Sequence, residues 1–143
     1  MTIVVGFLAT PEGRAALDAA AAEAERRSTG LLLVVSDRGA GASPEASAEQ
    51  SRALDAVRAE LDGRGLPYDV REMPQGRDVA EDLIGAAEGS DAALIVIGLR
   101  RRSPVGKLIL GVNAQRILLD APCPVLAVKP RGNEASSGAV VTQ

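Results

Sequence analysis

The stretch AALIVIG, residues 92–98, is the most hydrophobic run of the chain, and it leads into GLRRRSPVGKLILGVNAQR, residues 98–116. The first run is apolar without alternation, which predicts a central strand covered on both faces of a parallel sheet. The second supplies glycines, three consecutive arginines and a Gly-Lys pair, from which proteins build anion sites. This part of the chain therefore predicts both a fold and the place of a site.

The rest of the chain repeats the same alternation of apolar runs and Ala-rich helical patterns. Thr10 is a suitable cap and Pro11 a suitable first residue for the first helix. The alternation is typical of βαβ units, whose right-handed crossovers place helices on both faces of an open, doubly wound α/β sheet. We expect further strands at 2–8, 31–36, 67–73 and 124–129, and helices at about 11–29, 44–63, 78–88 and 113–121.

The length of 143 residues fits one domain, and the core must consist of Ala, Val, Leu and Ile because the chain has one Phe and one Tyr. Strand 67–73 alternates polar and apolar residues after Pro67, so we expect it at an edge of the sheet. The end of the chain is polar and rich in small residues. We therefore expect a domain over residues 1–131 and a flexible tail over 132–143.

Composition excludes several classes of function. A net charge of −3 argues against general attraction to nucleic acid or to an anionic membrane. The chain has no His and one cysteine, Cys123, so His-dependent catalysis, an internal disulfide and a metal cluster of His and Cys are excluded. No apolar segment approaches the roughly 20 residues that span a bilayer. We expect a cytoplasmic protein without a metal site.

The candidate site follows from the topology. In doubly wound sheets, ligands bind beyond the carboxyl ends of the strands, where the strand order reverses. That places Leu8 to Thr10, after the first strand, beside Gly98 and the residues after it. The Walker phosphate loop is excluded, because Leu108 follows Gly106-Lys107 and Arg101 stands at the position of the first glycine.

Two longer stretches carry a more specific signal. They are IVIGLRRRSPVGKLILGVNAQRILLDAPCPVLAVK, residues 95–129, and IVVGFLATPEGRAALDAA, residues 3–20. They resemble the universal stress protein family over about residues 2–130. The resemblance implies an adenine nucleotide α-hydrolase-like fold, a five-stranded parallel sheet of order 3-2-1-4-5, and a non-catalytic regulatory protein of the stress response. It also implies dimers paired through the fifth strand.

The family's nucleotide-binding members carry Gly-x2-Gly-x9-Gly-Ser/Thr after the fourth strand. By resemblance, Gly98 is the first glycine and Gly111 the third, whereas Arg101 replaces the second. Val112 stands at the hydroxyl position, and Asn113 is a good cap that would start the helix one residue later. After the first strand, the Asp-Gly-Ser of these members is replaced by Leu8, Ala9 and Thr10.

Two hypotheses follow for this partly altered site. In the first it still binds an adenine nucleotide such as ATP or AMP, or another anion; in the second, the protein is a structural or protein-interaction homodimer without nucleotide. Two lost hydrogen bonds to charged groups, at roughly 1.5 to 3 kcal/mol each, weaken binding about a hundredfold or more. The candidate residues are Leu8, Ala9, Thr10, Ile97, Gly98, Arg101, Gly111, Val112 and Asn113.

Several features have a structural alternative beside the functional one. Arg100, Arg101 and Arg102 form an anion clamp or a solvated loop, and Thr10 is better explained as a helix cap than as a ligand contact. Cys123 is best explained as a small buried residue. The loop 98–116 holds no Asp or Glu, which argues against an enzyme acting on phosphates, and the first strand lacks the acids of a phospho-receiver domain.

The fifth strand is apolar and needs a partner at its free edge. Pairing with its own copy across a two-fold axis would supply one. The residues of this predicted dimer edge are Val125, Leu126, Ala127 and Val128.

Overall fold

The computed structural model describes residues 2–8, 10–36, 44–73, 78–99, 112–130 and 139–142. Up to residue 128, helices and strands alternate along these ranges as the sequence predicts. The elements are β1 (Thr2–Phe7), α1 (Pro11–Arg27), β2 (Gly30–Ser36), α2 (Pro44–Arg64), β3 (Tyr68–Met73), α3 (Val79–Ser90), β4 (Ala92–Gly98), α4 (Val112–Asp120), β5 (Val125–Val128) and β6 (Ala139–Thr142).

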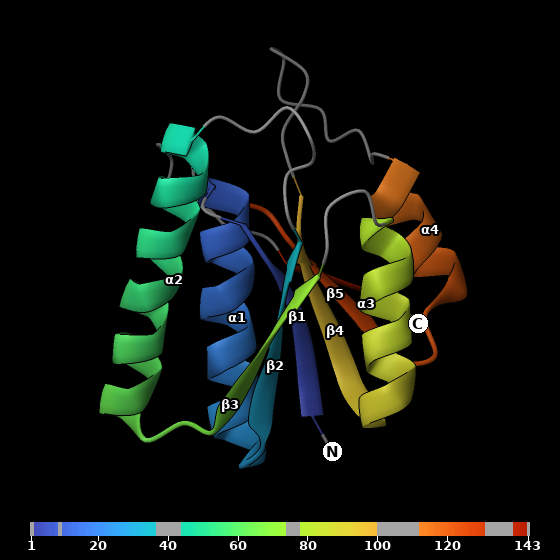
Figure 1. Cartoon of the computed structure of the whole chain (residues 1–143). Coiled ribbons are helices and arrows are strands. Elements are labelled where there is room, and N and C mark those ends of the chain that lie inside the picture. Colours follow the sequence, from blue (N-terminus) through green and yellow to red (C-terminus); the bar gives the residue numbers. More distant parts are fainter. Residues whose placement is uncertain are drawn as a thin grey trace.

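The sheet has the order β3-β2-β1-β4-β5-β6, so the predicted order 3-2-1-4-5 is confirmed. Its first five strands pair in parallel. Helices α1 and α2 lie on one side of the sheet, and α3 and α4 lie on the other (Figure 1). The strand order reverses between β1 and β4, whose carboxyl ends therefore flank the crevice in which ligands of such sheets bind.

Each central strand divides its side chains between two cores, because successive residues of a strand point to opposite faces. In β4, Leu94 and Val96 join the core under α1 and α2, whereas Ile95 and Ile97 join the core under α3 and α4. Helix α2 buries Leu54, Val57 and Leu61 against the sheet. Small alanines on α1 bring that helix close to the sheet, and they are Ala16, Ala20, Ala21 and Ala24.

The helix ends follow the capping signals in the sequence. Thr10 caps α1, since its hydroxyl oxygen accepts a hydrogen bond from the backbone N–H of Gly13 at 3.1 Å. Asp78 caps α3 in the same way through the amides of Ala80 and Glu81. Both helices end in a non-glycine residue in the left-handed region, Ser28 and Asp91. These caps fix where each helix leaves the sheet.

The far end of the chain differs from the expectation. Residues 139–142, placed by sequence in a flexible tail, form β6, which pairs antiparallel with β5. The edge of β5 that was expected to face a second copy is therefore paired within the chain. The local signal for this strand is AVVT, a short run in which Val and Thr favour strands. The homodimer itself stays a prediction.

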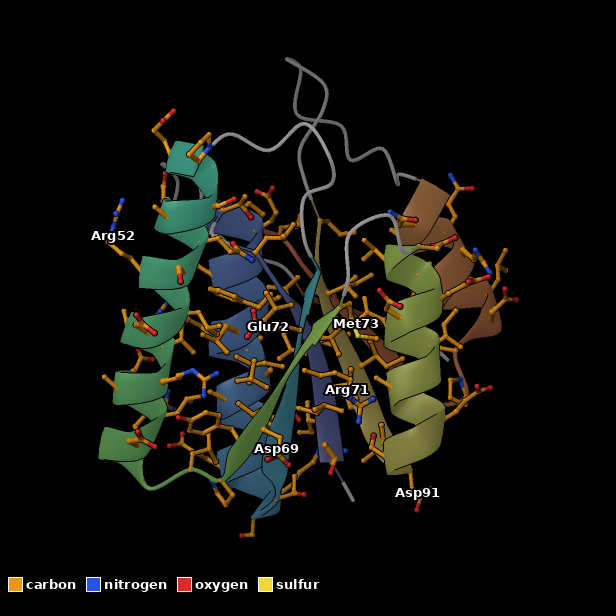
Figure 2. The ribbon with its side chains drawn as sticks, in the orientation of Figure 1. Arg52, Asp69, Arg71, Glu72, Met73 and Asp91 are labelled. Carbon is orange, nitrogen blue, oxygen red and sulfur yellow. The ribbon has the colours of Figure 1, made fainter. Side chains whose placement is uncertain are left out.

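The opposite edge of the sheet is β3, as predicted. Figure 2 shows Asp69, Arg71, Glu72 and Met73 following one another along this strand. Asp69, Arg71 and Glu72 are exposed, so charged side chains line an edge that no further strand covers among the described residues.

Candidate functional site

A pocket of about 350 Å³ lies at the carboxyl ends of β1 and β4, between α3 and α4. This is the crevice where the strand order reverses, and four of the predicted site residues, Leu8, Ile97, Gly98 and Asn113, line it. The other described lining residues are Gly6, Phe7, Val34, Val79, Leu83, Ala114 and Ile117.

The floor of the pocket is apolar because it belongs to the core under α3 and α4. Val34, Leu83, Ile97 and Ile117 are all members of that core. Gly6 leaves room for Leu83, since a β carbon at this position would lie 3.2 Å from the Leu83 Cδ1 atom. The floor therefore offers van der Waals contact to a flat or apolar part of a ligand.

The end of β1 supplies no acidic group. Leu8 lines the pocket, Thr10 is occupied as the cap of α1 and is not among the lining residues, and Ala9 lies outside the described residues. A hydroxyl that already accepts from the Gly13 amide is less available to a ligand. The structural alternative for Thr10, a helix cap, is thus the one that the geometry supports.

Gly98 has a steric role that is independent of any ligand. A β carbon on Gly98 would lie 2.1 Å from the backbone oxygen of Glu12, in the first turn of α1. Gly13 is equally constrained, since its β carbon would lie 2.1 Å from the backbone oxygen of Leu8. These two glycines allow α1 to start directly against the ends of β1 and β4. Gly98 stands out in the sequence because it follows a buried strand, whereas the constraint on Gly13 has no local signal, since it depends on the path of the chain through residue 8.

Helix α4 lines the side of the pocket that lies opposite α3. It begins at Val112, so Asn113 lies within its first turn instead of capping it one residue later. Asn113 is exposed and is the one described lining residue whose side chain carries both a hydrogen-bond donor and an acceptor. Ala114 beside it is small and packs on the core. The mouth of the pocket is thus polar at Asn113, and the small side chain of Ala114 leaves space beside it.

An ion network ties α4 to α3 beside the pocket. Arg116 donates from Nη1 to Asp78 Oδ2 at 2.5 Å and from Nη2 to Glu81 Oε1 at 2.9 Å. Ile117 and Val79, each adjacent in sequence to a member of this network, line the pocket. The network therefore holds together the two helices between which a ligand would lie.

This network sets the protonation of Asp78. Desolvation acts to raise the pKa of Asp78, but the backbone amides of Glu81 and Ala80 and the Arg116 guanidinium outweigh it and lower the pKa below its ordinary value. The stability that the carboxylate contributes is thus fully present above the ordinary pKa of about 3.9 and is lost as the pH falls through the lower pKa of the folded state. At neutral pH the network is intact.

The remaining part of the predicted anion loop lies outside the described residues. This applies to the three arginines 100–102, to Lys107 and to Gly111. Within the described ranges, no three His, Cys, Asp or Glu side chains gather as metal ligands. The same part of the chain contains no helix with the length and apolar character that crossing a membrane requires.

Comparison with known proteins gives a consistent result. The model of the universal stress protein family matches residues 1–129. A universal stress protein of Mycolicibacterium smegmatis (strain ATCC 700084 / mc(2)155) is 48% identical over 130 residues, which cover 91% of this chain and 98% of that protein.

Solved structures agree in fold. A universal stress protein of Archaeoglobus fulgidus has a TM-score of 0.72 and 32% identity, covering 89% of this chain and 97% of that one. A universal stress protein from the same organism in complex with dAMP has a TM-score of 0.68 and 26% identity, with coverage of 89% and 96%.

Proposed function

Because the chain belongs to the universal stress protein family, we propose that it is a non-catalytic, cytoplasmic regulator of the stress response. Its ligand is an adenine nucleotide such as AMP or ATP, bound in the pocket between β1 and β4. The structure of a relative at 26% identity in complex with dAMP supports the ligand class. The pocket carries the proposal.

The shape and chemistry of the pocket suit the adenosine moiety. Small-molecule sites are concave, roughly 300 to 1,000 Å³ in volume, and mostly apolar with a few polar groups that set orientation. The volume of about 350 Å³, the apolar floor and Asn113 at the mouth meet each condition. A flat base fits the floor formed by Val34, Leu83 and Ile97, with the phosphates directed toward the start of α4.

The altered positions define how strong this binding is expected to be. By the family resemblance, Leu8 stands where an acidic residue lies near the adenosine moiety, and Val112 stands where a hydroxyl residue starts α4. A hydrogen bond to a charged group contributes roughly 1.5 to 3 kcal/mol. We therefore expect affinity about a hundredfold or more below that of a pocket which keeps both groups.

A regulatory role without catalysis agrees with the side chains at the pocket. Among its described lining residues none carries a titratable side chain, so none can act as a general acid or base. The nearby carboxylates Asp78 and Glu81 are engaged by Arg116. An enzyme acting on phosphates would need an acid or base that faces the ligand.

Isothermal titration with AMP, ATP and cyclic AMP tests the proposal. Ala114→Leu fills the mouth of the pocket and is expected to weaken binding at least about tenfold, because the added side chain occupies ligand volume. The matched control is Ala22→Leu, the same change at an exposed position of α1. Equal affinity in both variants, or no heat with any nucleotide, contradicts the proposal.

The alternative is a protein-interaction role with a vacant cleft. The replacement of both polar contacts by Leu8 and Val112 favours it. The titration separates the two functions, since this alternative predicts that a correctly folded protein gives no heat of binding with any of the nucleotides.

A further inference from the structure

The two helices on either side of the pocket carry an excess of acidic residues. Within α3 and α4, both of which lie inside the described ranges, Arg116 is the single basic residue. The acidic residues of the two helices are Glu81, Asp82, Glu88 and Asp120. Asp78, the cap of α3, adds a further carboxylate. An anion that enters between these helices therefore meets negative charge.

A single guanidinium holds three of these carboxylates. Arg116 donates to Asp78 Oδ2 at 2.5 Å and to Glu81 Oε1 at 2.9 Å, and its Nε lies 3.9 Å from Asp120 Oδ2. The network thus combines one positive formal charge with three negative ones. Without the guanidinium, the three carboxylates would act on their surroundings unopposed.

The network lies close to the place expected for the phosphates of a ligand. Asp78 is adjacent in sequence to Val79, which lines the pocket, and Asn113 precedes Arg116 by three residues on α4. Residues three apart share one face of a helix and are separated by about 4.5 Å along its axis. Since the Debye length is about 10 Å at 0.1 M salt, phosphates at the start of α4 would lie within reach of these charges.

The ion pairs of Arg116 contribute little to folding. The side chains of Arg116 and Asp78 are 38% and 39% exposed. Ion pairs with this exposure have a small effect on the stability of a protein. Loss of Arg116 is therefore expected to leave the fold intact, which makes its effect on a ligand measurable.

We propose that Arg116 is a positioning residue for anionic ligands, because by neutralising Asp78 and Glu81 it keeps the start of α4 accessible to phosphate groups. It acts through these two carboxylates and not by contact with the ligand. The inference rests on the proposed nucleotide function and specifies which part of the ligand the network governs, the phosphates and not the base.

Two substitutions that break the same hydrogen bond separate charge from geometry. Arg116→Gln removes a positive charge and Glu81→Gln removes a negative one, and either change eliminates the ion pair of 2.9 Å between α4 and α3. If the network only holds the helices together, both variants bind nucleotide more weakly. Neutralisation instead predicts opposite shifts, with weaker binding in Arg116→Gln and tighter binding in Glu81→Gln.

Isothermal titration with adenosine, AMP and ATP in metal-free buffer at low salt measures these shifts. Adenosine is uncharged, whereas AMP carries about two negative charges and ATP about four. One pair of unit charges about 10 Å apart in water changes an equilibrium constant roughly twofold. Arg116→Gln should therefore raise the Kd of AMP roughly fourfold and that of ATP roughly tenfold, and change that of adenosine less than about twofold.

The other variants and the salt dependence sharpen the result. Glu81→Gln should lower the Kd of ATP severalfold, and Arg116→Lys, which keeps the charge, should bind ATP within about twofold of wild type. At about 1 M salt the Debye length falls to about 3 Å, so the differences between variants should disappear.

The matched control is Arg64→Gln. Arg64 also joins two helices, since it donates from α2 to Glu25 of α1 on the opposite side of the sheet, and its side chain is 33% exposed (Figure 1). The substitution changes the net charge of the chain by the same amount. Urea denaturation should show similarly small losses of stability for Arg64→Gln and Arg116→Gln, whereas the control should bind ATP like wild type.

Three results overturn the proposal while the nucleotide function stands. They are equal weakening of adenosine and ATP binding in Arg116→Gln, weaker ATP binding in Glu81→Gln, and unchanged ATP binding in Arg116→Gln. If Arg116→Gln does not fold, the direction of the shift in Glu81→Gln decides alone. A wild-type chain that gives no heat with any nucleotide contradicts the proposed function, and the inference falls with it.

Discussion

The two outermost strands of the parallel part of the sheet, β3 and β5, show two different ways to protect a sheet edge. β3 exposes Asp69, Arg71 and Glu72 along its length (Figure 2), whereas all four residues of β5 are buried. Charged side chains discourage a second chain from pairing at β3, and a covering strand does so at β5. Side-chain burial decides between these two kinds of protection, because a strand covered on both faces cannot carry charged side chains.

The difference arises from how far the helices extend over each edge. Leu126 and Val128 of β5 share a core with α1, and Val125 and Ala127 share the other core with Ile117 of α4. At β3, Tyr68 and Val70 pack partly against the core on the α1 and α2 side. Met73 packs partly against the core under α3 and α4. Asp69, Arg71 and Glu72 are exposed, so charges are tolerated there.

The largest expected effect comes from placing a carboxylate on β5, compared with placing one on β3. Leu126→Asp buries a carboxylate where the side chain is 8% exposed, and should lower the free energy of unfolding by at least about 4 kcal/mol, enough to unfold much of the protein. Arg71→Asp on β3 should change it by less than about 0.5 kcal/mol. Urea denaturation measures both, and similar losses at the two positions would break the comparison.

A smaller effect is expected when β3 loses its charges. Replacing Asp69, Arg71 and Glu72 together by Thr should leave the fold intact but make the edge adhesive, so that the average mass rises with concentration in light scattering. The control removes the same charges from exposed positions of α2, with Glu49→Gln, Arg52→Gln and Asp55→Gln. If the β3 variant stays as monodisperse as this control, charge is not what protects the edge.

The smallest effect concerns Cys123, which lies just before β5 and probes its surroundings. Burial raises the pKa of this thiol, against the opposing hydrogen bond with the Ile95 backbone. The folded state therefore resists forming the thiolate. No stability is lost below the ordinary pKa of about 8.5, and stability falls as the pH rises from there through the folded pKa.

Alkylation by iodoacetamide against pH should give a higher midpoint for the native protein than for the protein in urea. Cys123→Ala should also remove part of the loss of stability at alkaline pH. A native midpoint equal to or below the unfolded one would show that the start of β5 is as open as β3.

Most of the fold could be predicted from sequence because its signals are local. Apolar runs, the Thr10 cap and the alternation in β3 each depend on residues that are close along the chain. β6 was missed since four residues of strand-forming type in a polar tail form a strand only when β5 offers an edge. The same short run without that neighbour would have no reason to be extended.

The position of the candidate pocket could be predicted from the sequence better than its detail, although its role as a binding site stays a prediction. Leu8, Ile97, Gly98 and Asn113 follow from strand ends and the family pattern, and all four line the pocket. The partnership of Arg116 with Asp78 was not foreseen, because the two residues are 38 apart in sequence and meet only when α4 packs on α3. The contact of Leu83 with Gly6 could not be predicted either, because it depends on the folded approach of α3 to β1.

The close approach of Gly98 to the backbone of Glu12 bears on how such chains are classified. Since any side chain at 98 would collide with the first turn of α1, this glycine would be required by the architecture in a chain that had lost every trace of ligand affinity. A sequence motif that requires glycine at this position therefore identifies the fold and not nucleotide binding. Discrimination between nucleotide-binding and vacant members of such a fold has to come from pocket positions where the side chain is exposed and can vary, such as 113.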